Sequence, residues 1–244
     1  MEIRETKFVR QALTLAEVVA GSATCPIGEV VGAPGTGKSC AARAIVAKLP
    51  RAVRLVAWDG MSKFQAGREV AAALGFDGAG SVDRMLATRI DPDPATRTLL
   101  VVDEANKLSW RVLELLRYLS DECNVAVLLV GTELYSRQFA SARTRELLLQ
   151  LGSRIGAKRC QFGHLDRADA YTHVIKPRFG DIADKELVTR YWTVTRRGNL
   201  RECVELADEC QRLMQANGVR TLTPAVLELA AKWMANRVAT GMEA

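Results

Sequence analysis

Short apolar runs alternate with stretches of helical periodicity over the first two thirds of the chain. The runs at 27–31, 53–58, 98–102 and 125–130 have the length of strands, and 159–162 is a fifth candidate. The runs at 98–102 and 125–130 lack the polar alternation of a half-exposed strand, which indicates strands covered on both faces. The order strand, helix, strand, helix predicts a three-layer α/β fold built on a doubly wound, parallel, five-stranded sheet.

Helices are predicted before and between these strands from apolar spacings of three and four residues. Two of them have an N-terminal signal. Ser62 and Gln65 can form a capping box, and Ser109 can cap the helix that follows it. The expected helices span residues 4–20, 38–48, 62–74, 81 onward and 109–121.

From about residue 165 onward only helical periodicity remains. Two apolar stripes recur at three and four residues, and Thr223 followed by Pro224 marks the start of the second helix. The first stripe contains Cys203, Leu206, Ala207, Cys210, Leu213 and Met214, and the second contains Val226, Ala230, Trp233, Met234 and Arg237. We therefore expect an α/β domain over residues 1–163 and a small all-helical domain, here called the lid, over residues 164–244.

The composition excludes a disordered or fibrous protein, because 48% of the 244 residues are hydrophobic and 25% are charged. The first ten residues lack the apolar segment of a secretory signal, and no apolar run approaches the ~20 residues that cross a bilayer. A cytoplasmic protein is expected. Six cysteines without a C-x-x-C pair argue against a zinc site and for reduced core thiols. The tryptophans, Trp58 and Trp233 among them, are expected to pack in the core or between domains.

The net charge of +6 permits a polyanionic partner, but the position of the charges matters more than their sum. Residues 137–159 contain six lysines and arginines against Glu146 alone, a local surplus of five. Such a cluster suits a nucleic acid, and it equally suits a solvated helix face.

Residues 32–39, Gly-Ala-Pro-Gly-Thr-Gly-Lys-Ser, match the pattern G-x-x-x-x-G-K-[ST] between a predicted strand and a predicted helix. Glycines let successive backbone N–H groups point at phosphates, and the helix N-terminus adds the positive end of its dipole. Lys38 would place a charge at the β- and γ-phosphates, and Ser39 would offer an oxygen ligand to Mg²⁺. The expected ATP-binding residues are Gly32, Pro34, Gly35, Thr36, Gly37, Lys38 and Ser39.

Asp103 and Glu104 stand together at the carboxyl end of the buried strand at 98–102. Ligands of α/β proteins bind at that edge of the sheet. Asp103 would hold the hydration shell of Mg²⁺, and Glu104 would polarise the water that attacks the γ-phosphate. The adjacent pair favours hydrolysis over other phosphoryl transfers.

These residues resemble the AAA+ ATPases, and three further features extend the resemblance over essentially the whole chain. The sequence Val-Gly-Thr132 ends the fourth predicted strand, where the family places its sensor 1. Residues 151–154, Leu-Gly-Ser-Arg, look like its arginine-finger box, and residues 198–201, Gly-Asn-Leu-Arg, are similar to its sensor 2. The resemblance implies catalytic roles for Thr132, Arg154 and Arg201.

Within that family the chain looks most like the transposition regulators of the phage Mu B, TnsC and TniB type. The similarity rests on the compact core, on Thr132 with Glu133 after the fourth strand, and on the short helical lid with Arg201. Those ATPases assemble on double-stranded DNA as ATP-dependent helical filaments, select target sites and stimulate a DDE-type transposase. The resemblance implies the same partners here, in a bacterial host cell, for a protein encoded by a phage or transposon.

DNA contact is expected from the AAA+ core, because only residues 1–26 precede the first predicted strand and leave no room for the helix-turn-helix of the Mu B protein. Cations contributed by many subunits would release counterions and give sequence-tolerant binding. The candidate contacts are Lys63, Arg68, Arg137, Arg143 and Arg145.

An arginine finger would act in trans, with Arg154 of one subunit reaching the γ-phosphate held by another. Arg143 or Arg145 could serve instead, and Arg154 could be an ordinary surface residue. Two other functions remain open, a replication initiator or helicase loader and a nucleotide-gated scaffold with little turnover. A small-molecule kinase would need an acceptor pocket, for which the sequence gives no signal.

Overall fold

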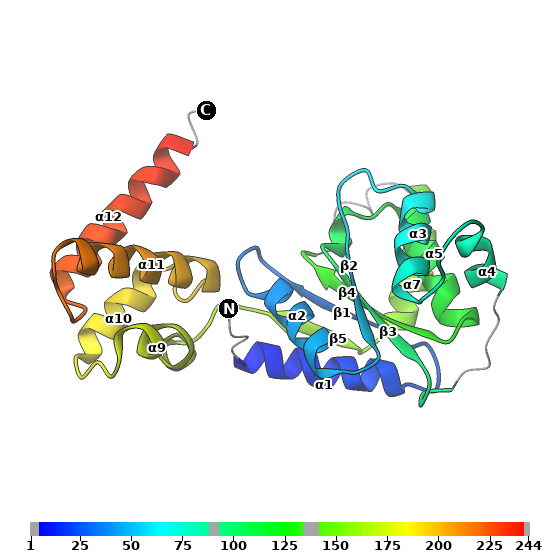
Figure 1. The fold of residues 1–244 in the computed structure, drawn as a ribbon, viewed down its shortest axis with the longest axis horizontal. Coiled ribbons are helices and arrows are strands. Elements are labelled where there is room, and N and C mark those ends of the chain that lie inside the picture. The colour runs from blue at the N-terminus through cyan, green and yellow to red at the C-terminus, as the bar shows by residue number, and fades with distance from the viewer. Residues whose placement is uncertain (1–4, 88–92, 134–141, 242–244) are drawn as a thin grey trace. The chain divides into compact units, whose positions relative to one another are not determined.

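A computed structural model gives the fold and describes residues 5–87, 93–133 and 142–241, without the side chains of residues 142, 143, 145, 147 and 236–241. Five parallel strands form one sheet in the order β2-β3-β4-β1-β5 (Figure 1). The strands are β1 Ile27–Gly32, β2 Ala52–Val56, β3 Thr98–Asp103, β4 Val125–Gly131 and β5 Arg159–Phe162. The predicted fold class is confirmed.

Helices cover both faces of this sheet, with α1 and α2 on one face and α3, α5 and α7 on the other (Figure 1). Leu99 and Val101 of β3 pack toward the first face, whereas Leu100 and Val102 pack toward the second. Burial on both faces explains why this strand is apolar without alternation. The helices are α1 Lys7–Gly21, α2 Lys38–Lys48, α3 Lys63–Ala73, α4 Ser81–Ala87, α5 Trp110–Glu122 and α7 Ala142–Ile155, with a 3₁₀ turn η1 at Ala105–Lys107.

The chain divides into two compact units, and the first, with Phe8–Pro34 and Lys38–Phe162, contains the whole sheet. The second is built on the helices that follow Gly163. Its core surrounds Tyr191, which is fully buried and donates its hydroxyl hydrogen to the backbone oxygen of Cys203. The helices are α8 Arg167–Ala170, the π-helical η2 Tyr171–Ile175, α9 Lys176–Phe179, α10 Lys185–Val194, α11 Leu200–Ala216 and α12 Pro224–Gly241.

The predicted start of α3 is confirmed in detail. Gln65 donates its backbone N–H to Ser62 Oγ at 3.2 Å, and Ser62 returns a backbone N–H to Gln65 Oε1 at 2.9 Å. Ser109 occupies the N-cap position of α5, as predicted, although its side chain makes no cap hydrogen bond. The backbone oxygen of Ser109 instead accepts the Val112 N–H at 3.0 Å.

Two tryptophans differ from their predicted packing. Trp58 lies beyond the end of β2 and is 41% exposed, and Trp233 on α12 is 40% exposed. Trp233 is shielded on one ring face by the Arg212 guanidinium, 5.7 Å from the ring centroid.

The four cysteines at positions 123, 160, 203 and 210 are buried thiols, as expected, whereas Cys25 is exposed and Cys40 is only partly buried, so these two are not core residues. Burial raises the pKa of Cys203 to about 11 and that of Cys210 to about 12, so both stay protonated at neutral pH. Among the described residues, no helix combines the length and the apolar character that a bilayer span requires.

Candidate nucleotide-binding site

The candidate site lies where three neighbouring strands reach the carboxyl edge of the sheet. β4 lies between β3 and β1, so the segments that follow these strands emerge side by side. They are Asp103 with Glu104 after β3, Thr132 after β4, and the glycine-rich loop after β1. The sequence-predicted groups are thus brought to the edge at which parallel sheets bind ligands.

Backbone geometry explains the glycines of the loop between β1 and α2. Gly35 and Gly37 have φ values of 81° and 98°, a region that L-residues with a Cβ rarely adopt. Gly32 lies so close to β5 that an added Cβ would approach the backbone oxygen of Phe162 to 2.5 Å. The loop can therefore follow this path only with glycine at these positions.

The Lys38 ammonium is folded over this loop at the start of α2. Its Nζ donates to the backbone oxygens of Gly32 and Ala33, both at 2.8 Å. Carbonyl acceptors are weaker partners for an ammonium group than charged oxygens. The lysine is therefore placed to exchange these carbonyls for phosphate oxygens above the loop.

Ser39 and Asp103, which are 64 residues apart in the sequence, are in direct contact. Ser39 Oγ donates to Asp103 Oδ1 at 3.1 Å, and the carboxylate is 2% exposed. A hydroxyl and a carboxylate oxygen side by side form the hard oxygen donor set that Mg²⁺ prefers, so the residues present fit that ion.

Arg54 holds the other oxygen of this carboxylate, and the sequence analysis did not identify it. Its Nη2 lies 2.5 Å from Asp103 Oδ2, while the Glu104 backbone N–H donates to Oδ1 at 3.0 Å. Arg54 comes from β2, which pairs in parallel with β3. An arginine inside a short apolar strand is the signal that could have indicated a buried partner.

Glu104 has a strained backbone, with φ 59° and ψ 32° in the left-handed region. A non-glycine residue held there costs of order 1–3 kcal/mol, and such residues cluster at functional sites. Its side chain is 43% exposed and lies 3.5 Å from Lys107 Nζ. The carboxylate is thus accessible to water and is presented by a fixed backbone turn directly after Asp103.

Asn106 links this turn to the end of β4 and is a second residue that the sequence analysis missed. Its Oδ1 accepts the backbone N–H of Thr132 at 3.1 Å. A Cβ on Gly131 would approach the same oxygen to 2.5 Å, so the two segments are in close contact. Thr132 is therefore fixed relative to the loop that carries Glu104.

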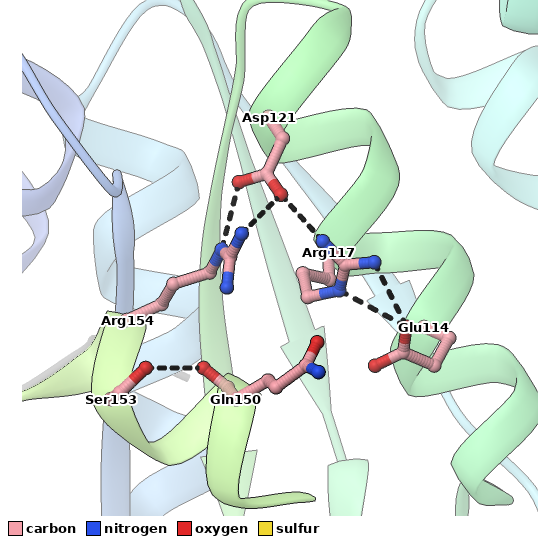
Figure 2. Close-up of polar contacts among 6 residues, drawn as sticks. All are labelled: Glu114, Arg117, Asp121, Gln150, Ser153 and Arg154. Carbon is pink, nitrogen blue, oxygen red and sulfur yellow. Dashed lines mark hydrogen bonds and ion pairs between the residues drawn. The ribbon is translucent and has the colours of Figure 1, made fainter. Parts of the chain in front are cut away.

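Arg154 lies at the opposite edge of the sheet from this site. It is near the C-terminus of α7, which leads into the amino end of β5. Its guanidinium forms two hydrogen bonds with Asp121 of α5 (Figure 2). The length of β1, about 20 Å at ~3.3 Å per residue, separates Arg154 from the phosphate loop of its own chain.

The remaining predicted residues are not all described. Lys63 and Arg68 are exposed on α3, close to the carboxyl end of β2. Arg143 and Arg145 lie on α7 with side chains outside the described part, and Arg137 is outside the described residues altogether. Their roles stay predictions.

Arg201 belongs to the second unit and is exposed in the first turn of α11. The helix is capped by Asn199, whose side-chain oxygen accepts the Glu202 N–H at 3.3 Å. Arg201 therefore lies at the start of a capped helix, while its sensor role stays a prediction.

Lys38→Ala should weaken ATP binding at least about tenfold, since each hydrogen bond to a charged group contributes about 1.5–3 kcal/mol. The measurement is titration with a fluorescent ATP analogue, with Lys48→Ala at the other end of α2 as the matched control. Equal affinity of the two variants would contradict the placement of the phosphates at this loop.

Comparison with known proteins gives three results. Residues 22–139 match the AAA domain family. The ATP-dependent target DNA activator B of Escherichia phage Mu is 32% identical over 176 residues, 68% of this chain and 53% of the relative. The Mu-like prophage FluMu DNA transposition protein B of Haemophilus influenzae is 30% identical over 135 residues, 53% of this chain and 45% of the relative. The chain thus spans about half the length of these relatives.

Among solved structures, the Aeropyrum pernix ORC2 protein superposes with a TM-score of 0.66 at 15% identity. The match covers 91% of this chain and 66% of that one. At this identity the likeness shows the fold alone, which is the P-loop AAA+ fold.

Proposed function

We propose that this chain is an ATP-hydrolysing regulator of DNA transposition. The proposal rests on two findings: residues 22–139 belong to the AAA domain family, and the chain is related to the Mu-type target DNA activators. In this proposal it binds double-stranded DNA without sequence preference, assembles on it as a helical filament in the cytoplasm and delivers the target to a DDE-type transposase. The observation that carries the hydrolytic part is the contact of Ser39 with Asp103 beside the strained Glu104.

Different residues of the site would bind the phosphates, hold the metal ion and accept the proton of the attacking water. The backbone of residues 32–37 and the Lys38 ammonium would bind the β- and γ-phosphates. Ser39 and Asp103 would hold Mg²⁺, which neutralises the charge that develops on the phosphate oxygens. Glu104 would accept a proton from the attacking water while the water oxygen forms a bond to the γ-phosphorus. The bond between the γ-phosphorus and the bridging β-phosphate oxygen then breaks, which releases ADP and phosphate.

The position of Arg154 supports an assembly in which two chains complete one site. A guanidinium at the amino edge of the sheet is too far from the phosphate loop of its own chain to contact a bound triphosphate. A second chain, stacked with its amino edge toward that loop, could present the arginine in trans. The γ-phosphate would then strengthen the interface through a charge-assisted contact, and its hydrolysis would weaken the interface.

DNA binding is supported by the relatives, which are a DNA transposition protein and a target DNA activator, and by exposed cations of this chain. Lys63 and Arg68 are exposed on one short helix, α3, whose N-terminus is capped by Ser62. Each chain would supply only a few phosphate contacts, so strong binding would require many chains on one duplex.

DNA binding by the ATP-loaded protein should therefore depend steeply on salt. When salt rises from about 50 to 200 mM, the affinity of a protein that makes six to ten phosphate contacts with DNA falls roughly 10³- to 10⁵-fold. Fluorescence anisotropy with duplexes of unrelated sequence measures the slope of the logarithm of affinity against the logarithm of salt concentration. The double variant Lys63→Ala, Arg68→Ala should have a shallower slope than the control Lys48→Ala. A slope near zero would contradict binding through phosphates.

A further inference from the structure

The Arg154 side chain is held in one orientation by a carboxylate on the neighbouring helix. Its Nε donates to Asp121 Oδ1 at 3.0 Å, and its Nη2 donates to Asp121 Oδ2 at 2.9 Å (Figure 2). Two parallel bonds of this kind fix the guanidinium plane as well as its position. Asp121 lies in the last turn of α5, and Arg154 lies in the last turn of α7.

Asp121 is itself held by a second arginine on its own helix. Arg117 Nη1 donates to Asp121 Oδ2 at 2.7 Å, and Arg117 Nε donates to Glu114 Oε2 at 3.0 Å (Figure 2). All four side chains are about a quarter exposed. The carboxylate thus cannot rotate away from Arg154 without giving up its bond to Arg117.

The bonds to Asp121 use only one edge of the Arg154 guanidinium. Among the described residues, Nη1 of Arg154 has no hydrogen-bond partner, and the side chain is 27% exposed. Arg117 is shared between Asp121 and Glu114, so the two arginines and the two carboxylates of this cluster carry no net charge. The free edge can still donate its Nη1 N–H groups to an anion while the other edge stays bound to Asp121.

We propose that Asp121 is a positioning residue for the arginine that acts in trans. It holds the Nε edge of Arg154 so that the Nη1 edge is presented to the γ-phosphate of an ATP bound by a second copy of the chain. This inference rests on the proposed function. A free arginine loses side-chain conformational entropy when it binds a phosphate, whereas a guanidinium that is already oriented does not.

A subunit-mixing experiment tests this role. A Glu104→Gln chain binds ATP without turnover and supplies Arg154, whereas an Arg154→Ala chain has an intact Glu104 but lacks the arginine. A mixture of the two on duplex DNA should hydrolyse ATP well above either chain alone. Asp121→Asn is then placed in one chain or the other.

The two placements have opposite expected results. In the Glu104→Gln chain, which donates the arginine, Asp121→Asn should lower the rate of the mixture about 10- to 100-fold, as expected for a misplaced catalytic group. In the Arg154→Ala chain the same change should leave the rate within about twofold, because that chain presents no arginine. Asp121→Glu in the donating chain should restore part of the rate.

Equal losses in both placements, or no loss in the donating chain, would overturn the role of Asp121 and leave the trans arginine intact. An inactive parent mixture would instead overturn the trans arginine and the role of Asp121 with it. Glu122→Gln, an exposed neighbour on α5, is the matched control for both placements.

A readout without turnover separates positioning from folding. Asp121→Asn alone should need a higher concentration of a slowly hydrolysed ATP analogue for half-maximal assembly on DNA, measured by sedimentation. Its thermal unfolding should stay close to that of Glu122→Gln, since partly exposed ion pairs contribute little to the free energy of unfolding. Unchanged assembly, or an assembly defect that only parallels a loss of folding, would contradict the proposal.

Discussion

Arg154→Ala is expected to lower the DNA-stimulated ATPase rate about 10³- to 10⁵-fold, the range that an arginine finger contributes in other nucleotide hydrolases. The loss arises because no guanidinium would stabilise the charge that develops on the γ-phosphate of the neighbouring chain. Steady-state turnover at saturating ATP and DNA measures the effect. Lysine at this position should rescue little, because it lacks the planar fork that can bind Asp121 and a phosphate together.

The affinity of dilute, unassembled protein for ATP should stay within about twofold in this variant, since Arg154 lies at the far edge of its own sheet. Arg111→Ala, which removes an exposed arginine from α5, is the matched control. A collapse of ATP affinity in the dilute Arg154→Ala protein would show that the arginine acts within its own chain, and normal turnover would show that it is an ordinary surface residue.

Glu104→Gln should lower turnover about 10²- to 10⁴-fold, the usual contribution of a general base. The amide keeps the shape of the side chain but cannot accept the proton of the attacking water. Loss of the 3.5 Å ion pair with Lys107 should matter little, because both side chains are more than 40% exposed. Single-turnover measurement of phosphate release gives the rate directly.

ATP affinity and assembly on DNA should be unchanged in Glu104→Gln, because the carboxylate is not among the groups that would bind phosphate. The exposed carboxylate of Glu122 provides the control, as Glu122→Gln. Turnover near that of the control would mean that another group activates the water, whereas loss of ATP affinity would mean that Glu104 has a role in binding.

The sheet could be predicted from the sequence because its physical signal is local. β3 and β4 are apolar on both faces, and β5 was placed at 159–162 as the structure has it. The phosphate loop is recognisable for a similar reason. Its residues are consecutive, and two of its glycines, Gly35 and Gly37, adopt positive φ values that other residues rarely adopt. Ser39 and Asp103 could be paired because each motif implies a place at the carboxyl edge.

The residues that the sequence did not indicate act through long-range pairing. Arg54 reaches Asp103 only because β2 lies beside β3, and Asn106 reaches Thr132 only because β4 follows in the sheet. Asp121 meets Arg154 through the packing of α5 against α7. None of these side chains belongs to a motif, so only the folded arrangement reveals their partners.

The central claim is that ATP is bound between two copies of the chain on duplex DNA. Electron microscopy of the protein with a slowly hydrolysed ATP analogue and a long duplex tests this most directly. We expect helical filaments that require the analogue, with Arg154 of one copy beside the γ-phosphate held by Lys38 of the next. Closed rings would favour an initiator or helicase loader. Nucleotide-bound monomers that do not bind DNA, with the triphosphate contacted by one chain only, would contradict the account.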